Sequence, residues 1–346
     1  MVKNMGNPGP ESIEASIRHG GDLGRARASF PRAPEPWIDL STGINPHSYP
    51  HSPLPATAFS RLPEPAALER LKAVAANAFG APSAAHLAAA PGTQMLMPLL
   101  AEIAVQQGAK NAAVLTPAYA EHARTARMTG LAVTEVAAFI DLWDFDYAVV
   151  INPNNPDGRV IERSDLVALA DHMSRKGGVL VVDEAFIETG YAASVGDAAA
   201  IEGLVVLRSF GKFYGMAGLR LGFAIAHPDI AKRLEQRLGP WAVSGPALHV
   251  ATQALADRDW RDAMRLRLKE EAARLDGVLR KAGMVVVGGT SLFRLVRDER
   301  SAALFNHLAA RGILVRIFDE RPNDVRFGLP ETEAEWTRLQ AALSEF

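Results

Sequence analysis

The chain has 346 residues, 48% hydrophobic and 22% charged, which is typical of a globular protein with a sizeable core and about two domains. Its 37 Lys and Arg residues nearly balance its 39 Asp and Glu residues, so the charge predicts neither a nucleic-acid partner nor a polyanionic tail. The absence of cysteine excludes disulfides, thiolate metal sites and a cysteine nucleophile, and it favours a cytoplasmic location.

Residues 1–60 are rich in Pro, Gly, Ser and His and show little hydrophobic periodicity. They lack the apolar stretch of a signal peptide, and no run in the chain approaches the length of a membrane span. We expect an N-terminal arm over residues 1–50 that packs with a small C-terminal domain. A large domain is expected over residues 51–235 and the small domain over residues 236–346.

Helix and strand patterns alternate from residue 64 onward. Helices are predicted over residues 64–81, 93–107, 120–130 and 163–177. Short apolar strands are predicted over residues 85–92, 111–119, 131–138, 146–156, 178–186 and 203–210. Several of these strands are near-continuous β-branched runs, as in buried parallel strands. The alternation predicts an α/β fold with a mostly parallel sheet and helices on both faces.

The pattern changes after residue 229. A long charged helix is predicted over residues 260–283, and it leads to strand-like segments at 284–296 and 313–330. A last helix is predicted over residues 331–346. These elements predict a smaller α+β domain.

Polar residues follow the predicted strands, at the edge of the sheet where open α/β folds bind ligands. Each has an ordinary structural explanation as well as a functional one. Gly92 and Thr93 fit a helix cap or a phosphate site. Tyr119 fits a rim position or a stacking surface for a flat ring, and Asn155 fits a rigid turn or a ligand contact. Asp183 fits a cap or a charged partner for a ligand.

Lys212 lies in "SFGKFYGMAGLRLGF". The glycines and aromatic residues around it offer little surface along which the apolar stem of a solvent-exposed lysine could lie. Ser209 and Arg220 flank it and suggest an anion site shared with Gly92 and Thr93. Taken together, the strand-end residues match the needs of pyridoxal 5'-phosphate. This cofactor forms a Schiff base with a lysine, pairs its ring nitrogen with a carboxylate and stacks on an aromatic ring.

The motifs "NPNNPDGR", "VVDEAF" and "SFGKFYGMAGLRLGF" resemble, in the same order, those of the fold-type I pyridoxal-phosphate enzymes in the class I and II aminotransferase branch. The resemblance implies an aspartate-aminotransferase-like fold with Lys212 and Asp183 as the catalytic residues. It implies further cofactor contacts, with the phosphate at Gly92, Thr93, Ser209 and Arg220, the ring face at Tyr119 and the ring hydroxyl at Asn155.

Within this branch, "HGGDL", "WIDLSTGINPHSYP", "GPWAVSGPA" and "VRFGLP" look like the threonine-phosphate decarboxylases of cobalamin biosynthesis. Two positions depart from the related aminotransferases. Phe186 replaces a tyrosine that bonds the cofactor hydroxyl. Leu62 replaces a tyrosine that reaches the cofactor phosphate of the neighbouring subunit.

The same resemblance implies a set of substrate-binding residues: His19, Gly20, Gly43, Asn45, Asn155, Arg316 and Arg326. It predicts decarboxylation of L-threonine O-3-phosphate to (R)-1-amino-2-propanol O-2-phosphate and CO2. A histidinol-phosphate-type aminotransferase is the alternative. A non-catalytic regulator is the third possibility, but such a protein is expected to carry a helix-turn-helix domain, for which residues 1–60 are too short and too Pro-rich.

The expected partners are a small phosphorylated amino acid and a second copy of the chain in a homodimer. No nucleic acid, membrane or metal is expected.

Overall fold

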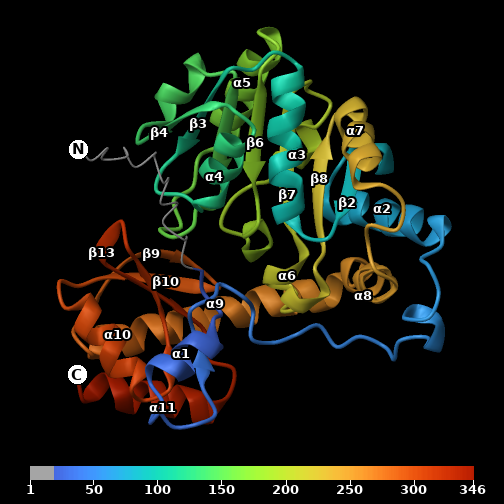
Figure 1. Cartoon of the computed structure of the whole chain (residues 1–346). Helices are drawn as coiled ribbons and strands as arrows, with labels where there is room; N and C mark the ends of the chain where they lie inside the picture. Colours follow the sequence, from blue (N-terminus) through green and yellow to red (C-terminus); the bar gives the residue numbers. More distant parts are fainter. Residues whose placement is uncertain (1–18) are drawn as a thin grey trace, which may run out of the picture.

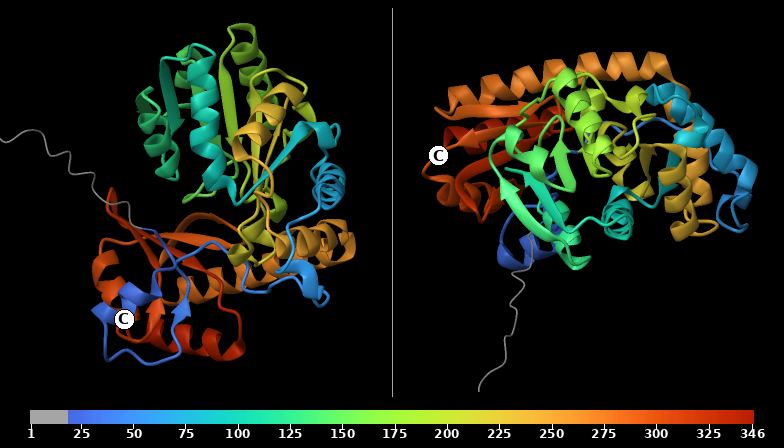
Figure 2. Two further views of the ribbon diagram at one scale, coloured as in Figure 1. Left: turned by 45° about the vertical axis from the view of Figure 1, so that its right-hand side comes forward. Right: turned by 90° about the horizontal axis from the view of Figure 1, so that it is seen from above.

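The computed structural model describes residues 19–346. Two large sheets organise this part of the chain, a seven-stranded central sheet and a four-stranded sheet nearer the C-terminus, and a two-stranded sheet accompanies them (Figures 1 and 2). The long helix α9 (Arg258–Lys281) runs beneath the central sheet and continues alongside the C-terminal sheet. Every helix within residues 19–346 is too short or too polar to cross a membrane.

The central sheet has the strand order β2-β8-β7-β6-β5-β3-β4. Its strands are β2 (Leu87–Ala90), β3 (Asn111–Leu115), β4 (Ala132–Val136), β5 (Tyr147–Ile151), β6 (Val179–Asp183), β7 (Leu204–Ser209) and β8 (Gly222–Ala226). Strands β7, β6, β5, β3 and β4 pair in parallel, and β8 is antiparallel to both of its neighbours. The mostly parallel sheet is therefore confirmed, although no strand was predicted at β8.

Alternate side chains of these strands enter two separate cores, one on each face of the sheet. The first face is covered by α3 (Thr93–Gln106), α4 (Glu121–Met128) and α7 (Pro228–Leu238). The opposite face is covered by α2 (Pro65–Phe79), α5 (Arg163–Arg175) and α8 (Gly245–Ala256). Pro65 opens α2 and the left-handed Gly80 (φ 71°) ends it, as expected for these two residue types. Helices on both faces are thus confirmed.

The C-terminal sheet is antiparallel, with the order β12-β13-β10-β9. Its strands are β9 (Val285–Thr290), β10 (Phe293–Arg297), β12 (Arg316–Phe318) and β13 (Arg321–Gly328). Two further helices belong to this part of the chain, α10 (Ser301–Ala309) and α11 (Glu333–Ser344). A capping box of Thr332 and Glu335 fixes the start of α11.

The described part of the N-terminal arm packs on this C-terminal unit (Figure 1). Helix α1 (Leu23–Ser29) contributes Ala26 to a small core that also contains Ala309, and β1 (Ile38–Asp39) pairs in parallel with β11 (Ile313–Leu314). Residues 1–18 of the predicted arm lie outside the described residues. The predicted domain limits stay a prediction, and α8, which follows the limit at residue 235, packs against α2 of the large unit.

Short 3-10 turns complete the described chain at Ala56–Ala58, Ala84–His86, Phe139–Asp144, Ile187–Thr189, Gly196–Ala198 and Ala217–Leu219. The single helical turn α6 (Phe210–Phe213) follows β7 directly and carries Lys212. The carboxyl ends of β5, β6 and β7 therefore open toward the C-terminal sheet and the arm, between the two units of the chain.

Candidate active site

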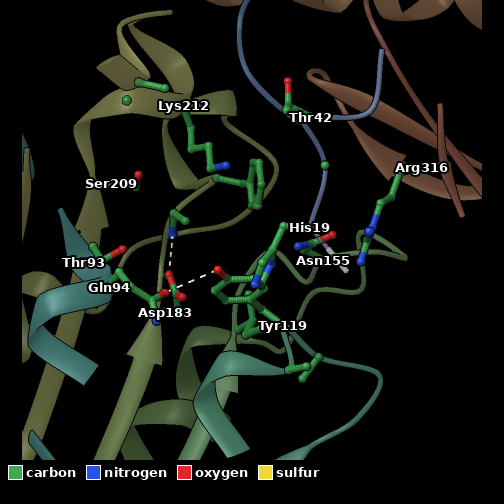
Figure 3. Close-up of a pocket in the computed structure, with 18 of the residues that line it drawn as sticks. His19, Thr42, Thr93, Gln94, Tyr119, Asn155, Asp183, Ser209, Lys212 and Arg316 are labelled. Carbon is green, nitrogen blue, oxygen red and sulfur yellow. Dashed lines mark hydrogen bonds between the residues drawn. The ribbon is translucent and has the colours of Figure 1, made fainter. Parts of the chain in front are cut away.

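A cavity of about 460 Å³ lies at this edge of the central sheet, and the arm and the C-terminal sheet complete its wall (Figure 3). From the large unit it is lined by the predicted residues Gly92, Thr93, Tyr119, Asn155, Asp183, Ser209, Lys212 and Arg220. From the arm and the C-terminal sheet it is lined by His19, Gly20, Arg316 and Arg326. The structure thus brings together residues that lie up to about three hundred positions apart in the sequence.

Lys212 extends from α6 into the cavity, on the same side as Asp183 and Ser209 (Figure 3). Its amine lies 5.9 Å from the centre of the Phe186 ring. Burial, followed by repulsion from the Arg326 and Arg220 guanidiniums, lowers the pKa of Lys212 to about 8, with Asp183 acting in the opposite direction. A sizeable fraction of this amine is therefore neutral near physiological pH, as a nucleophilic lysine requires.

Asp183 ends β6 with its carboxylate buried and held from two sides. Its Oδ1 accepts a hydrogen bond from the Ala185 backbone N–H at 3.0 Å, and its Oδ2 lies 2.8 Å from His122 Nε2. His122 is itself buried, in the first turn of α4. Two fixed partners leave this carboxylate little rotational freedom, which suits a group that must face one ring atom of a ligand.

An anion cradle is formed by the start of α3 and the turn after α6. Gly92 (φ 90°) occupies the helix N-cap, and a Cβ there would lie 2.6 Å from Arg220 Nη2. Gly222 is equally constrained, because a Cβ there would lie 2.5 Å from the Thr93 backbone N. The two glycines keep the backbone N–H groups of the helix start and the Arg220 guanidinium close together. Ser209 adds a hydroxyl to the same wall.

Tyr119 belongs to a hydrogen-bonded chain that reaches the arm. Its hydroxyl donates to Gln94 Oε1 at 3.3 Å, and Gln94 Nε2 donates to Glu121 Oε2 at 2.7 Å. The other oxygen of Glu121 lies 3.4 Å from His19 Nε2. Burial, followed by the charges of Glu121 and Asp183, raises the pKa of Tyr119 to about 12, so its ring stays neutral. His19 is thereby held at the rim beside Tyr119 (Figure 3).

Arg326 is a buried guanidinium on β13 that bridges the large unit and the arm. Its Nη1 donates to Asn155 Oδ1, and its Nη2 donates to the Ser41 backbone O at 2.8 Å. Burial, followed by repulsion from Arg316, lowers the pKa of Arg326 to about 9. Two neighbouring guanidiniums in one cavity wall strongly favour an anion between them.

The sequence model of the family described as aminotransferase class I and II matches residues 37–343. The chain belongs to this family. Threonine-phosphate decarboxylase from Pseudomonas aeruginosa is 41% identical over 335 residues, which cover 95% of this chain and 98% of that protein. Threonine-phosphate decarboxylase from a Sinorhizobium species is 40% identical over 334 residues, with coverages of 96% and 99%.

Among solved structures, the chain is similar to histidinol-phosphate aminotransferase from Sinorhizobium meliloti in complex with pyridoxal-5'-phosphate. The TM-score is 0.78 at 21% identity, over 95% of each chain. At this identity the likeness concerns the fold alone. It confirms the predicted fold of the pyridoxal-phosphate-dependent transferases.

The cavity of this class I and II aminotransferase family member fits pyridoxal 5'-phosphate by the chemistry of its groups. Lys212 supplies an amine of lowered pKa, and Asp183 supplies a fixed carboxylate. The glycines at 92 and 222 let the start of α3 approach Arg220 and the turn after α6 closely, so that backbone N–H groups and a guanidinium lie together as a phosphate requires. Among residues 19–346, no group of three or more His, Asp or Glu side chains could hold a metal ion.

Gly43 and Asn45 were predicted to bind substrate, but the structure does not bring them into the cavity lining. Asn45 is buried, and its Nδ2 donates to the Phe213 backbone O at 2.8 Å. Its backbone N–H donates to the Lys212 carbonyl at 2.9 Å. Gly43 packs against the ring of Phe186, where a Cβ would lie 3.0 Å from the nearest ring carbon. The two residues therefore pin the arm onto the lysine-bearing turn, while Gly20 lines the cavity.

The two departures from the aminotransferase pattern have different surroundings. Phe186 is buried in the cavity wall, with its ring edge-on to Phe293 at 5.1 Å. Leu62 is 66% exposed and lies outside the cavity, beside Pro63 and Leu248 in a separate surface hollow.

The sequence interpretation missed several residues of the site. Some of them fix predicted site residues: His122 bonds Asp183, and Gln94 links Tyr119 to Glu121. Others line the cavity themselves: Thr42, Phe318, Asp319 and Glu320. The only sequence signal for His122 is that it lies three residues after Tyr119, in the first turn of the predicted helix. Nothing in the sequence placed the loop at residues 318–320 over the cavity.

Proposed function

We propose that this protein is a pyridoxal-phosphate-dependent decarboxylase of L-threonine O-3-phosphate. The observation that carries the proposal is the pair of neighbouring arginines, Arg316 and Arg326, in the cavity that encloses Lys212. Two adjacent guanidiniums suit a substrate with two anionic groups, a carboxylate and a phosphate. The identity of about 40% to two threonine-phosphate decarboxylases, over nearly the full length of each, supports the reaction type.

Arg326 would bind the substrate carboxylate, because its guanidinium lies deeper and is fixed by Asn155 and the arm. Arg316 would bind the phosphate, with His19 at the same rim. Gly20 and the neighbouring arm residues Ser41 and Thr42 help to close the cavity against water. Holding the substrate at both ends fixes its orientation, and orientation decides which bond at the α-carbon breaks.

Gly92, Thr93, Ser209 and Arg220 would hold the cofactor phosphate, Tyr119 the ring face and Asn155 the ring hydroxyl. When bound, pyridoxal phosphate supplies an electron-withdrawing ring that accepts the electron pair of the bond that breaks. Asp183, fixed by His122, would keep a proton on the ring nitrogen. Lys212 Nζ would anchor the cofactor and displace the amine product, and either Lys212 or a nearby acid would return a proton to the carbon that loses CO2.

A histidinol-phosphate-type aminotransferase is the alternative. Both activities need Lys212 and Asp183, so these residues do not distinguish them. The similarity to a solved histidinol-phosphate aminotransferase, at 21% identity, supports only the fold.

A homodimer, a cytoplasmic location and a role in cobalamin biosynthesis are part of the same proposal. The family resemblance supports the dimer and the pathway, and the absence of cysteine is consistent with a reducing compartment.

The deciding experiment incubates the holoenzyme with L-threonine O-3-phosphate, with and without 2-oxoglutarate. We expect CO2 without 2-oxoglutarate, in an amount equal to the amine formed, and no CO2 from the Lys212→Ala variant. Turnover that requires 2-oxoglutarate and yields glutamate would establish the aminotransferase instead.

A further inference from the structure

A cluster of buried charges lies next to the cavity, on the face of the central sheet that α2, α5 and α8 cover. Asp183 and Ser209 end β6 and β7 and face the cavity. Glu184 and Arg208, the adjacent residues, point to the other side because side chains alternate along a strand. Glu188 completes the charged group from the turn after β6. All three charged side chains are buried.

Arg208 bonds both carboxylates at once. Its Nη1 donates to Glu184 Oε2 at 3.0 Å, its Nη2 donates to Glu188 Oε1, and its guanidinium lies 4.4 Å from the centre of the Phe79 ring. Glu184 also accepts hydrogen bonds from the Val195 backbone N–H at 2.8 Å and from a serine hydroxyl at 2.6 Å. The side chains are therefore fixed in one arrangement, and they join the ends of two strands that carry cavity residues.

Three charges in one core are not explained by stability alone. Burial of charged groups is costly, and apolar side chains of similar volume often stabilise a protein as well or better. Burial indeed raises the pKa of Glu184, with Arg208 acting against it. The directional bonds of this group are better suited to holding a geometry than to adding stability.

Four polar atoms next to this group are buried and have no hydrogen-bond partner among the described residues: Glu188 Oε2, Arg208 Nε, Tyr214 Oη and Arg261 Nε. They share one neighbourhood. Arg261 bonds the Ala78 carbonyl, adjacent to Phe79 beneath Arg208. The ring of Tyr214 stacks on Trp260, the residue before Arg261, with centres 5.7 Å apart. Burial and then the charge of Glu188 raise the pKa of Tyr214.

An acceptor and three donors without partners are the usual setting of an internal water molecule. Tyr214 also connects this place to the catalytic turn. It lies two residues after Lys212, its ring stacks on Phe210 at 4.5 Å, and its carbonyl accepts from the arm residue Tyr49 at 3.0 Å. A shift of Tyr214 would therefore move the turn that aims the Lys212 amine.

We propose that Arg208 is a positioning residue that braces, with Glu184 and Glu188, the strand ends carrying Asp183 and Ser209. Water bound between Glu188, Tyr214 and Arg261 extends this brace to the turn of Lys212. The inference rests on the proposed function only in so far as Lys212 holds the cofactor.

The test measures three quantities: the dissociation constant of the cofactor, the pH dependence of chemical modification of the Lys212 amine in the apoprotein, and the stability of the protein in urea. Arg208→Lys keeps the charge but loses the two-pronged contact, and Tyr214→Phe removes only the hydroxyl. We expect about tenfold weaker cofactor binding for Arg208→Lys and a smaller loss for Tyr214→Phe. In both, the midpoint of Lys212 modification should move upward from about 8, toward that of a solvated amine.

Glu184 bonds the segment at residues 194–197 through the Ser194 hydroxyl and the Val195 N–H. Arg163→Lys is the matched control, because Arg163 bonds the Ser194 carbonyl and Asp197 of this segment from the exposed side. This control should change neither cofactor binding nor the midpoint of Lys212 modification. A triple variant, Glu184→Gln with Arg208→Met and Glu188→Gln, removes all three charges together. It should regain stability relative to Arg208→Met alone while its cofactor binding stays weak. That separation distinguishes positioning from a purely structural role.

The proposal is overturned if Arg208→Lys and Tyr214→Phe both fold and leave cofactor binding and Lys212 modification within about twofold of wild type. The triple variant binding cofactor as tightly as wild type would overturn it equally. A high-resolution crystal structure should show water bonded to Glu188 and Tyr214, and a direct bond with no such water would refute the bridging step. None of these measurements uses a substrate, so a failed decarboxylation assay would leave them intact.

Discussion

Removing the charge of Arg326 should disable the cavity for its anionic substrate. In Arg326→Gln the side chain keeps a hydrogen-bonding group but loses the guanidinium that Asn155 and the arm hold in place. Losing a buried charge-assisted contact costs about 2–5 kcal/mol. We therefore expect kcat/KM for L-threonine O-3-phosphate to fall about 30-fold to 5,000-fold.

The control for this variant is Arg297→Gln in β10, because Arg297 belongs to the same sheet but pairs with Asp324 away from the cavity. Asp324 is buried but keeps Arg321 as a second partner when the exposed Arg297 is changed, so stability should fall only modestly and activity should stay. The two roles of the arginines are separated with L-threonine, which lacks the phosphate. Arg316→Gln should weaken turnover of threonine phosphate only, whereas Arg326→Gln should weaken that of both compounds. A folded Arg326→Gln enzyme within about threefold of wild-type kcat/KM would refute the reasoning.

Four further predictions concern the cofactor and the assembly. Borohydride reduction of the yellow holoenzyme should fix the cofactor on Lys212, and a label on another lysine would contradict the assignment. Covalent uptake of cofactor by the apoprotein should rise with pH and level off above about 8, because burial and Arg326 favour the neutral, nucleophilic amine; levelling only near pH 10 would argue against this. His122→Phe should weaken cofactor binding about 10-fold to 150-fold through loss of its bond to Asp183, whereas His172→Phe, which loses a bond to a backbone carbonyl outside the cavity, should not. If the cofactor dissociation constant of His122→Phe were unchanged, His122 would have no part in cofactor binding. Light scattering should give a homodimer, and a fully active monomer would contradict that expectation.

The large unit could be predicted well because its signals are local. The strands of the central sheet are short apolar runs, and the polar residue after each run marks the edge where ligands bind. Asp183 and Lys212 could be placed in one cavity from this rule alone, before any family resemblance was considered. Strand β8 escaped prediction because its sequence continues the glycine-rich segment around Lys212.

The contacts of individual arm residues could not be predicted from the sequence, because their partners lie far along the chain. Asn45 is fixed by backbone groups of Lys212 and Phe213, far along the chain. A polar residue that directly precedes a proline is equally compatible with a ligand contact and with a structural anchor. The structure distinguishes the two, since both ends of the Asn45 amide are occupied, by Phe213 and by the His47 backbone N–H.

The bond between Arg326 and Asn155 links the two halves of the proposed site. Because Arg326 donates to Asn155 Oδ1, the amide is oriented with its Nδ2 donor available to another acceptor. The residue proposed to bind the substrate carboxylate thus also orients the residue proposed to bond the cofactor hydroxyl. This link explains why Asn155 belongs to both the predicted cofactor-binding and the predicted substrate-binding residues. The link matters more in this chain because Phe186 has no hydroxyl that could also bond the cofactor hydroxyl. A change at Arg326 should consequently alter cofactor binding as well as substrate binding.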